Sequence, residues 1–186
     1  LNASLIISNL GNSGLVIKAE NENSVISSGK VVFFDSQNLV ANKLFDLINY
    51  SRNENIAKLR EKDIQEKTAR VEAFFSRYNA VIKGYGEILV RKADECGGDY
   101  RILVGIAGNE SGLGRSPYKL YNPFGYLDGV QYSDWEDALS TISCKISQRF
   151  IAPCQGDLEC IIKRYGGPET PREQWIGSVT WFMNQV

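Results

Sequence analysis

Residues 99 to 126 read DYRILVGIAGNESGLGRSPYKLYNPFGY, and this stretch decides the fold because it joins an apolar helix to a glycine-rich loop. Asp99 can accept a hydrogen bond from the first free amides of a helix, so a helix is predicted to begin there. The residues that follow are apolar on nearly all sides, which predicts a buried helix. Gly112 is placed to end it.

Two glycines lie inside this predicted helix. Gly105 and Gly108 each cost about 1 kcal/mol of helix propensity relative to alanine. Their presence suggests that another segment of backbone approaches the helix closely at these two positions.

One carboxylate, Glu110, lies in the last turn of the predicted helix. It stacks over Leu103 and Ala107, which precede it by seven and three residues. Apolar neighbours and the negative end of the helix both disfavour its charge and therefore favour the protonated acid. A protonated acid is what cleavage of a glycosidic bond needs, because the leaving oxygen must receive a proton.

The motifs around and after Glu110 resemble those of the lysozyme-like superfamily, which includes lytic transglycosylases and bacterial N-acetylglucosaminidases. Members carry an E-S-G or E-S-x-x-G-x-S helix end, followed by an N-x-F-G turn. Transglycosylases also carry a Y-N-A-G-P segment, whose asparagine is replaced here by Gly166. The resemblance extends over roughly residues 66 to 186. The three segments that carry it read ESGLGRS (110–116), YNPFGY (121–126) and RYGGP (164–168).

This resemblance implies an enzyme that cleaves the β-1,4 bond between N-acetylmuramic acid and N-acetylglucosamine in peptidoglycan. Glu110 would protonate the leaving oxygen and then act as the base. Transglycosylases use the muramoyl C6 hydroxyl as nucleophile and leave a 1,6-anhydro end, whereas lysozymes use water. Lytic transglycosylation is the favoured outcome because it needs only one essential carboxylate. The residues that would contact or position the sugar are Ser111, Asn122, Phe124, Gly125, Tyr126 and Tyr165.

Two alternatives stay open at this point. A two-carboxylate hydrolase would need a partner about 5 to 9.5 Å from Glu110. The candidate partners are more typical of turns and helix caps, where aspartate is favoured intrinsically. The second alternative is a lysozyme-like domain that serves as a non-catalytic glycan-binding or assembly module of a cell-envelope machine. The candidate partners are Asp128, Asp134, Glu136 and Asp137.

Composition excludes several other classes of function. The chain has no histidine, which removes the usual base of Ser and Cys triads and the commonest zinc ligand. Its cysteines form no C-x-x-C pair, so we expect neither a metal site nor a cofactor. A net charge of -1, from 21 basic and 22 acidic residues, gives no general attraction for nucleic acid or anionic lipid.

Four cysteines predict two disulfides in an exported protein, with three connectivities available. The favoured pairing joins Cys96 to Cys144 and Cys154 to Cys160; the alternative is four reduced cysteines in a cytosolic protein. The chain has no run of about 20 apolar residues, as a membrane span would need. It begins at Leu1, so we expect an upstream signal or anchor and an extracellular or cell-envelope location.

The chain is predicted to have three segments. Residues 1–35 read as short strands at 4–7, 15–17 and 31–34 or as a partly ordered tail. Residues 36–65 read as a charged helical linker that spaces or dimerises, and residues 66–186 read as the catalytic domain. The predicted class is mainly α (α+β): a lysozyme-like helical domain with a small β element at 130–132, preceded by a β-rich and helical N-terminal appendage.

Overall fold

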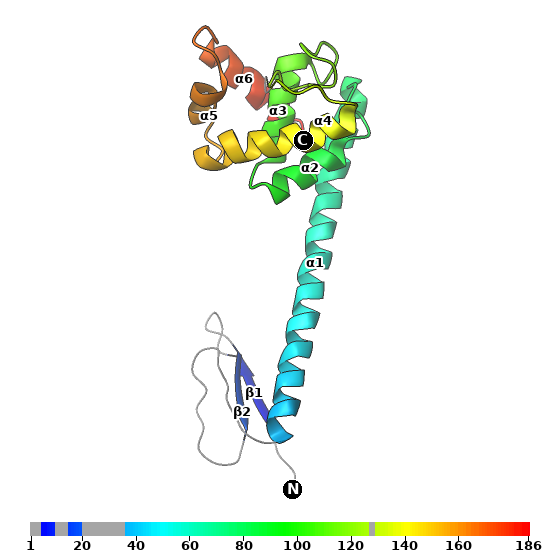
Figure 1. Ribbon diagram of the computed structural model, residues 1–186, viewed down its shortest axis with the longest axis vertical. Coiled ribbons are helices and arrows are strands. Elements are labelled where there is room, and N and C mark those ends of the chain that lie inside the picture. Colours follow the sequence, from blue (N-terminus) through cyan, green and yellow to red (C-terminus); the bar gives the residue numbers. More distant parts are fainter. Residues whose placement is uncertain (1–4, 10–14, 20–35, 127–128) are drawn as a thin grey trace. The chain divides into compact units, whose positions relative to one another are not determined.

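The computed structural model describes residues 5–9, 15–19, 36–126 and 129–186, with side chains from residue 42 onward. It divides into two compact units, Leu1–Glu54 and Asn55–Val186. In the first unit, strand β1 (Leu5–Asn9) pairs antiparallel with strand β2 (Leu15–Ala19), as Figure 1 shows. The strand predicted at 31–34 lies outside the described residues.

Helix α1 (Ser36–Tyr78) is continuous over 43 residues and belongs to the second unit from Asn55 onward. Within that unit Ile64 is buried in the core. Glu61 forms two hydrogen bonds, of 2.7 and 3.0 Å, with the guanidinium of Arg91 on helix α2 (Gly86–Glu95). Residues 55–65, which the sequence suggests as a linker, therefore contribute directly to the packing of this unit.

The second unit is built from helices, which confirms the predicted mainly α class. The strand predicted at 130–132 is wrong, because these residues form no strand. A strand is held in register by one buried face, and here Val130 is 42% exposed and Gln131 is exposed as well. After α2 the helices are α3 (Tyr100–Ser111), α4 (Trp135–Ile146), the π-helix η2 (Ser147–Ile151), the 3₁₀ turn η3 (Ala152–Cys154), α5 (Leu158–Tyr165) and α6 (Arg172–Met183).

Helix α3 is the central helix of this unit, in contact with α2 and α6 (Figure 1). The Asp99 side chain caps it by accepting the backbone N–H of Arg101 at 2.9 Å. Gly112 ends it in the left-handed conformation, with φ of 60°. Both ends are therefore those that the sequence predicts, and every residue from 102 to 108 is buried between them.

Both glycines of α3 lie against α6; the predicted close approach of another backbone segment is confirmed at Gly105, whereas at Gly108 the close neighbour is a side-chain ring. A Cβ added at Gly105 would stand 2.8 Å from the backbone oxygen of Val179. At Gly108 it would stand 2.4 Å from the ring of Phe182. Side chains of ordinary size do not fit at these distances, so the glycines determine how near α6 lies to α3.

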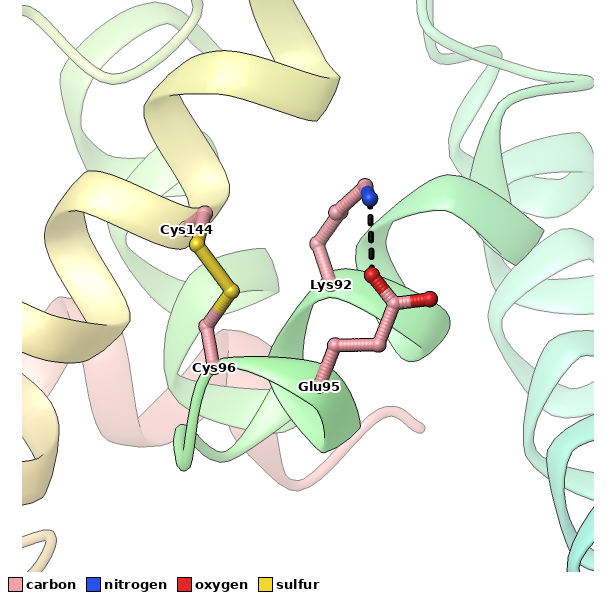
Figure 2. The surroundings of a disulfide bond; sticks show 4 residues. All are labelled: Lys92, Glu95, Cys96 and Cys144. Atoms are coloured by element: carbon pink, nitrogen blue, oxygen red, sulfur yellow. Dashed lines mark hydrogen bonds and ion pairs between the residues drawn. A yellow bond between two sulfur atoms is a disulfide. The ribbon is translucent and has the colours of Figure 1, made fainter.

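Two disulfides join neighbouring elements with the favoured connectivity. Cys96, which follows α2, is bonded to Cys144 of α4, and the Lys92–Glu95 ion pair lies beside it (Figure 2). Cys154 of η3 is bonded to Cys160 of α5. No helix in the part of the chain that the structure describes has the length and apolar character to cross a membrane.

Candidate functional site

Three segments that are far apart in the chain meet around Glu110. They are the last turn of α3, the loop at 121–126, and residues 165–175, which run from the end of α5 into α6. Together they enclose a cavity of about 370 Å³. Its wall includes Asn109, Glu110, Gly125, Tyr165, Thr170 and Trp175.

Glu110 is half-buried, and one of its two oxygens is held by two donors. Its Oε1 accepts the indole N–H of Trp175 at 2.9 Å and the side-chain amide of Asn109 at 3.0 Å. From the sequence, only the apolar neighbours on the same helix are expected around Glu110. The structure adds two N–H donors, and hydrogen bonds from such donors stabilise a carboxylate. The surroundings of Glu110 are therefore both apolar and hydrogen-bonding.

Gly125 stands directly beside the other oxygen of this carboxylate. A Cβ at Gly125 would lie 3.0 Å from Oε2 of Glu110, and the residue adopts a left-handed φ of 67°. Both facts favour glycine over any larger residue. Gly125, predicted to line the site, does line the cavity.

Three other predicted site residues lie beneath the cavity wall. Ser111 accepts the backbone N–H of Gly114 at 2.9 Å, and its hydroxyl lies 2.7 Å from the carbonyl oxygen of Pro123. Asn122 donates to the carbonyl oxygen of Tyr126 at 2.7 Å and accepts from the backbone N–H of Phe124 at 3.2 Å.

The side chains of Ser111, Asn122 and Phe124 are buried, and none of them is among the described residues that line the cavity. In this structure they fix the shape of the loop that carries Gly125. Direct contact of these three residues with a sugar stays a prediction.

Tyr165 connects this loop to α5. Its hydroxyl donates a hydrogen bond to the carbonyl oxygen of Phe124, and its ring lines the cavity. Burial raises the pKa of Tyr165 well above its ordinary value, and the negative charge of Glu110 and the neighbouring Tyr126 act in the same direction. Tyr165 is thus a neutral donor at physiological pH.

The π-helix η2 supplies a residue that sequence reasoning missed. Phe150 packs edge-on against Tyr126 and Tyr165, with ring centroids 5.9 and 5.2 Å away. Tyr126 is partly buried by this contact and does not line the cavity. A π-helix changes the direction of side chains within a helix and is often found near functional sites; here it places Phe150 between the two motif tyrosines.

Three of the four candidate second carboxylates are absent from the described wall of the cavity. Asp134 caps α4 by accepting the backbone N–H of Asp137 at 2.8 Å, and Asp137 faces the backbone N–H of Ser133 at 3.3 Å. Glu136 is exposed, and Asp128 lies outside the described residues. Among the residues that the structure describes, Glu110 is the only acidic side chain in the wall of the cavity.

A larger hollow, of about 600 Å³, lies between α1, α2 and the start of α3. Most of its charged side chains already form ion pairs, such as Arg101 with Asp99 at 2.6 Å and Lys67 with Asp63, and Arg70 donates to the hydroxyl of Tyr100 at 3.3 Å. Its half-buried acid, Asp99, is already engaged, because it caps α3 and pairs with Arg101. The smaller cavity is therefore the candidate site.

No family model, curated protein or solved structure matches this chain. The function is therefore argued from the residues and geometry of the chain itself.

Proposed function

We propose that this protein cleaves the β-1,4 glycosidic bonds of peptidoglycan glycan strands by lytic transglycosylation, with Glu110 as general acid and base. One observation carries the proposal: Glu110 is the only acid in the described wall of the cavity, with Oε1 held by two donors and Oε2 beside Gly125. The resemblance of the E-S-x-x-G-x-S and N-x-F-G motifs to the lysozyme-like superfamily supports the same chemistry.

One carboxylate suffices for this reaction. Glu110 gives its proton to the glycosidic oxygen while the bond from that oxygen to the muramoyl C1 breaks. The resulting carboxylate takes the proton of the muramoyl C6 hydroxyl as the C6 oxygen bonds to C1. The products are a 1,6-anhydro end and a free C4 hydroxyl, so atoms and protons balance without water.

The cavity suits a neutral, polar ligand. Its volume of about 370 Å³ falls within the range of small-molecule sites. Apart from Glu110, its described wall carries no charged side chain, and Asn109, Thr170 and Gln174 offer hydrogen-bonding groups. Hydroxyl and acetamido groups of an amino sugar are the matching chemistry. A location outside the cytoplasm belongs to this proposal and is compatible with the two disulfides.

The test is incubation of the protein with purified peptidoglycan, followed by mass analysis of the released muropeptides. We expect products with 1,6-anhydro ends; reducing ends would instead indicate a hydrolase. Glu110→Gln keeps the shape of the side chain but cannot deliver a proton, so the rate should fall by about 10² to 10⁴-fold. The matched control is the exposed Glu136→Gln, whose rate should stay within about tenfold of wild type, or roughly 1.4 kcal/mol in the barrier.

Near-wild-type turnover by a folded Glu110→Gln protein would overturn the mechanism. Retained binding to peptidoglycan with no release by the wild-type protein would overturn the enzymatic function and favour a non-catalytic glycan-binding module. Thermal unfolding of each variant shows whether a loss of activity is a loss of fold.

A further inference from the structure

We infer that Trp175 is a positioning residue for Glu110, one that keeps the exchangeable proton of the acid on Oε2, the oxygen beside Gly125. The inference rests on the proposed role of Glu110 as general acid. Its basis is the position of the two donors: the indole N–H of Trp175 and the amide of Asn109 both reach Oε1, at 2.9 and 3.0 Å.

The chemistry of these donors determines where a proton can sit. Two N–H donors reach Oε1, and an O–H on Oε1 would meet both of them, so a neutral Glu110 carries its O–H on Oε2. An indole N–H is a donor only, in every protonation state of its partner. An asparagine amide can turn its oxygen toward the same atom. Trp175, and not Asn109, is therefore the group that distinguishes the two oxygens.

Trp175 is held rigidly enough for this role. Only 4% of its surface is exposed, and its ring packs against that of Tyr165, with centroids 6.1 Å apart. One turn further along α6, Val179 contacts Gly105 of α3. The close approach of the two helices thus fixes the indole relative to the last turn of α3, where Glu110 lies.

A proton on Oε2 has a defined direction. Gly125 is the neighbour of Oε2 and lines the same cavity, and a Cβ at Gly125 would stand 3.0 Å from this oxygen. The leaving glycosidic oxygen should therefore bind on the side of Gly125, away from α6. A rotation of the carboxylate that exchanged the two oxygens would direct the proton at α6 instead.

The first experiment measures the pair without any substrate. The chain has three tryptophans, so a ¹H–¹⁵N spectrum of the full chain shows three indole signals, and Trp175→Phe identifies the one from Trp175. We expect that signal to shift with pH in the wild-type protein as Glu110 titrates and to be independent of pH in Glu110→Gln. A Trp175 signal that does not respond to pH, or that titrates unchanged in Glu110→Gln, would overturn the inference.

The second experiment separates positioning from simple packing. Trp175→Phe keeps one aromatic ring and loses the pyrrole part of the indole with its N–H, so kcat should fall by up to about 100-fold with little change in KM. The shape of the pH–rate profile should also differ from that of wild type, because a donor to the carboxylate of Glu110 has been removed. Trp181→Phe, on the half-exposed side of the same helix, is the control and should keep the wild-type profile.

These outcomes are distinguishable from a failure of the proposed function. If the wild-type protein releases no muropeptides, the glycosidase proposal fails, and the indole titration still decides whether Trp175 and Glu110 act as a pair. If the protein is active and Trp175→Phe loses rate equally at every pH, Trp175 is only a packing residue, and the inference is wrong.

Discussion

At the scale of single residues, the loop beside Glu110 is held by side chains that bond to its backbone. Tyr165 illustrates this, because its hydroxyl holds the carbonyl oxygen of Phe124 while its ring forms part of the cavity wall. The side chains of Ser111 and Asn122 donate hydrogen bonds to the carbonyl oxygens of Pro123 and Tyr126 in the same loop. Gly125 is consequently presented to Glu110 by a loop that is fixed from several directions.

The raised pKa of Tyr165 leads to a prediction about stability at alkaline pH. The folded protein keeps the phenolic proton where the unfolded chain, with a pKa of about 10, has lost it. This contribution to stability is fully present below pH of about 10 and is lost as pH rises toward the folded-state value. The free energy of unfolding should therefore fall more steeply above about pH 10 for wild type than for Tyr165→Phe.

Urea unfolding at neutral and alkaline pH measures this difference. Tyr165→Phe should be less stable at neutral pH by about 1 kcal/mol, the value of a lost hydrogen bond, and this gap should narrow with pH. Tyr118→Phe, at a position that is 80% exposed, is the control and should follow wild type. A gap that stays constant across the pH range would contradict the burial of the Tyr165 hydroxyl.

At the scale of elements, the pairing of α3 with α6 positions the acid and its donor together. Gly105 and Gly108 allow α6 to lie against α3, and this contact brings Trp175 to Glu110. The π-helix η2 likewise helps to position Tyr165 in the cavity wall, since its Phe150 packs against the ring of Tyr165. The geometry of the site is thus a property of how helices pack, beyond the residues that line it.

A substitution at Gly108 tests this packing. Gly108→Ala would place a Cβ 2.4 Å from the ring of Phe182, so we expect a loss of about 1 to 3 kcal/mol from overpacking despite the better helix propensity of alanine. Gly177→Ala, on α6 with nothing within 4 Å of the added Cβ, should be neutral or stabilising by up to about 1 kcal/mol. Chemical unfolding measures both, and equal effects would show that α6 does not depend on this approach.

At the scale of the whole molecule, the chain divides at Glu54 and Asn55, and the second unit holds the cavity together with both disulfides. The Cys96–Cys144 bond spans 48 residues and the Cys154–Cys160 bond spans six. In the chain-entropy model the longer loop stabilises more, by about 4 compared with about 2 kcal/mol. The first bond therefore contributes more to holding the helices of this unit together.

Truncation locates the start of the folding unit. We predict that residues 55–186 fold alone and that residues 66–186 are less stable by about 1.5 to 3 kcal/mol, because the second fragment lacks the buried Ile64. It also lacks Glu61, whose pKa is lowered by the hydrogen bond from Arg91. The contribution of that pair is present above pH of about 4.5 and is lost as pH falls through the lowered pKa.

Thermal unfolding and near-ultraviolet circular dichroism of the two fragments show where the folding unit begins. Equal stability at neutral and acidic pH would place the start of the unit at residue 66, as the motifs alone suggest. A molten 55–186 fragment would show that the unit needs residues before Asn55.

The sequence by itself determines the features whose causes are local. Asp99 and Gly112 bound α3 because capping acts within one turn of a helix. Gly105 and Gly108 indicate a close neighbour because glycine inside a helix has a cost that packing must offset. The same local reasoning makes Glu110 the candidate acid. The four cysteines predict two disulfides, and the pairing favoured among the three possible is the one in the structure.

Only the tertiary structure decides what lies around that acid. The donor Trp175 is 65 residues away from Glu110 and reaches it because α6 packs on α3. Phe150 comes from a π-helix, which the periodicity of apolar residues does not predict. Ser111 and Asn122 bond to the loop backbone and do not line the cavity. Contacts of this kind depend on which helices meet, and residue type and spacing along one segment do not say which they are: the glycines of α3 indicate a close neighbour without identifying it as α6.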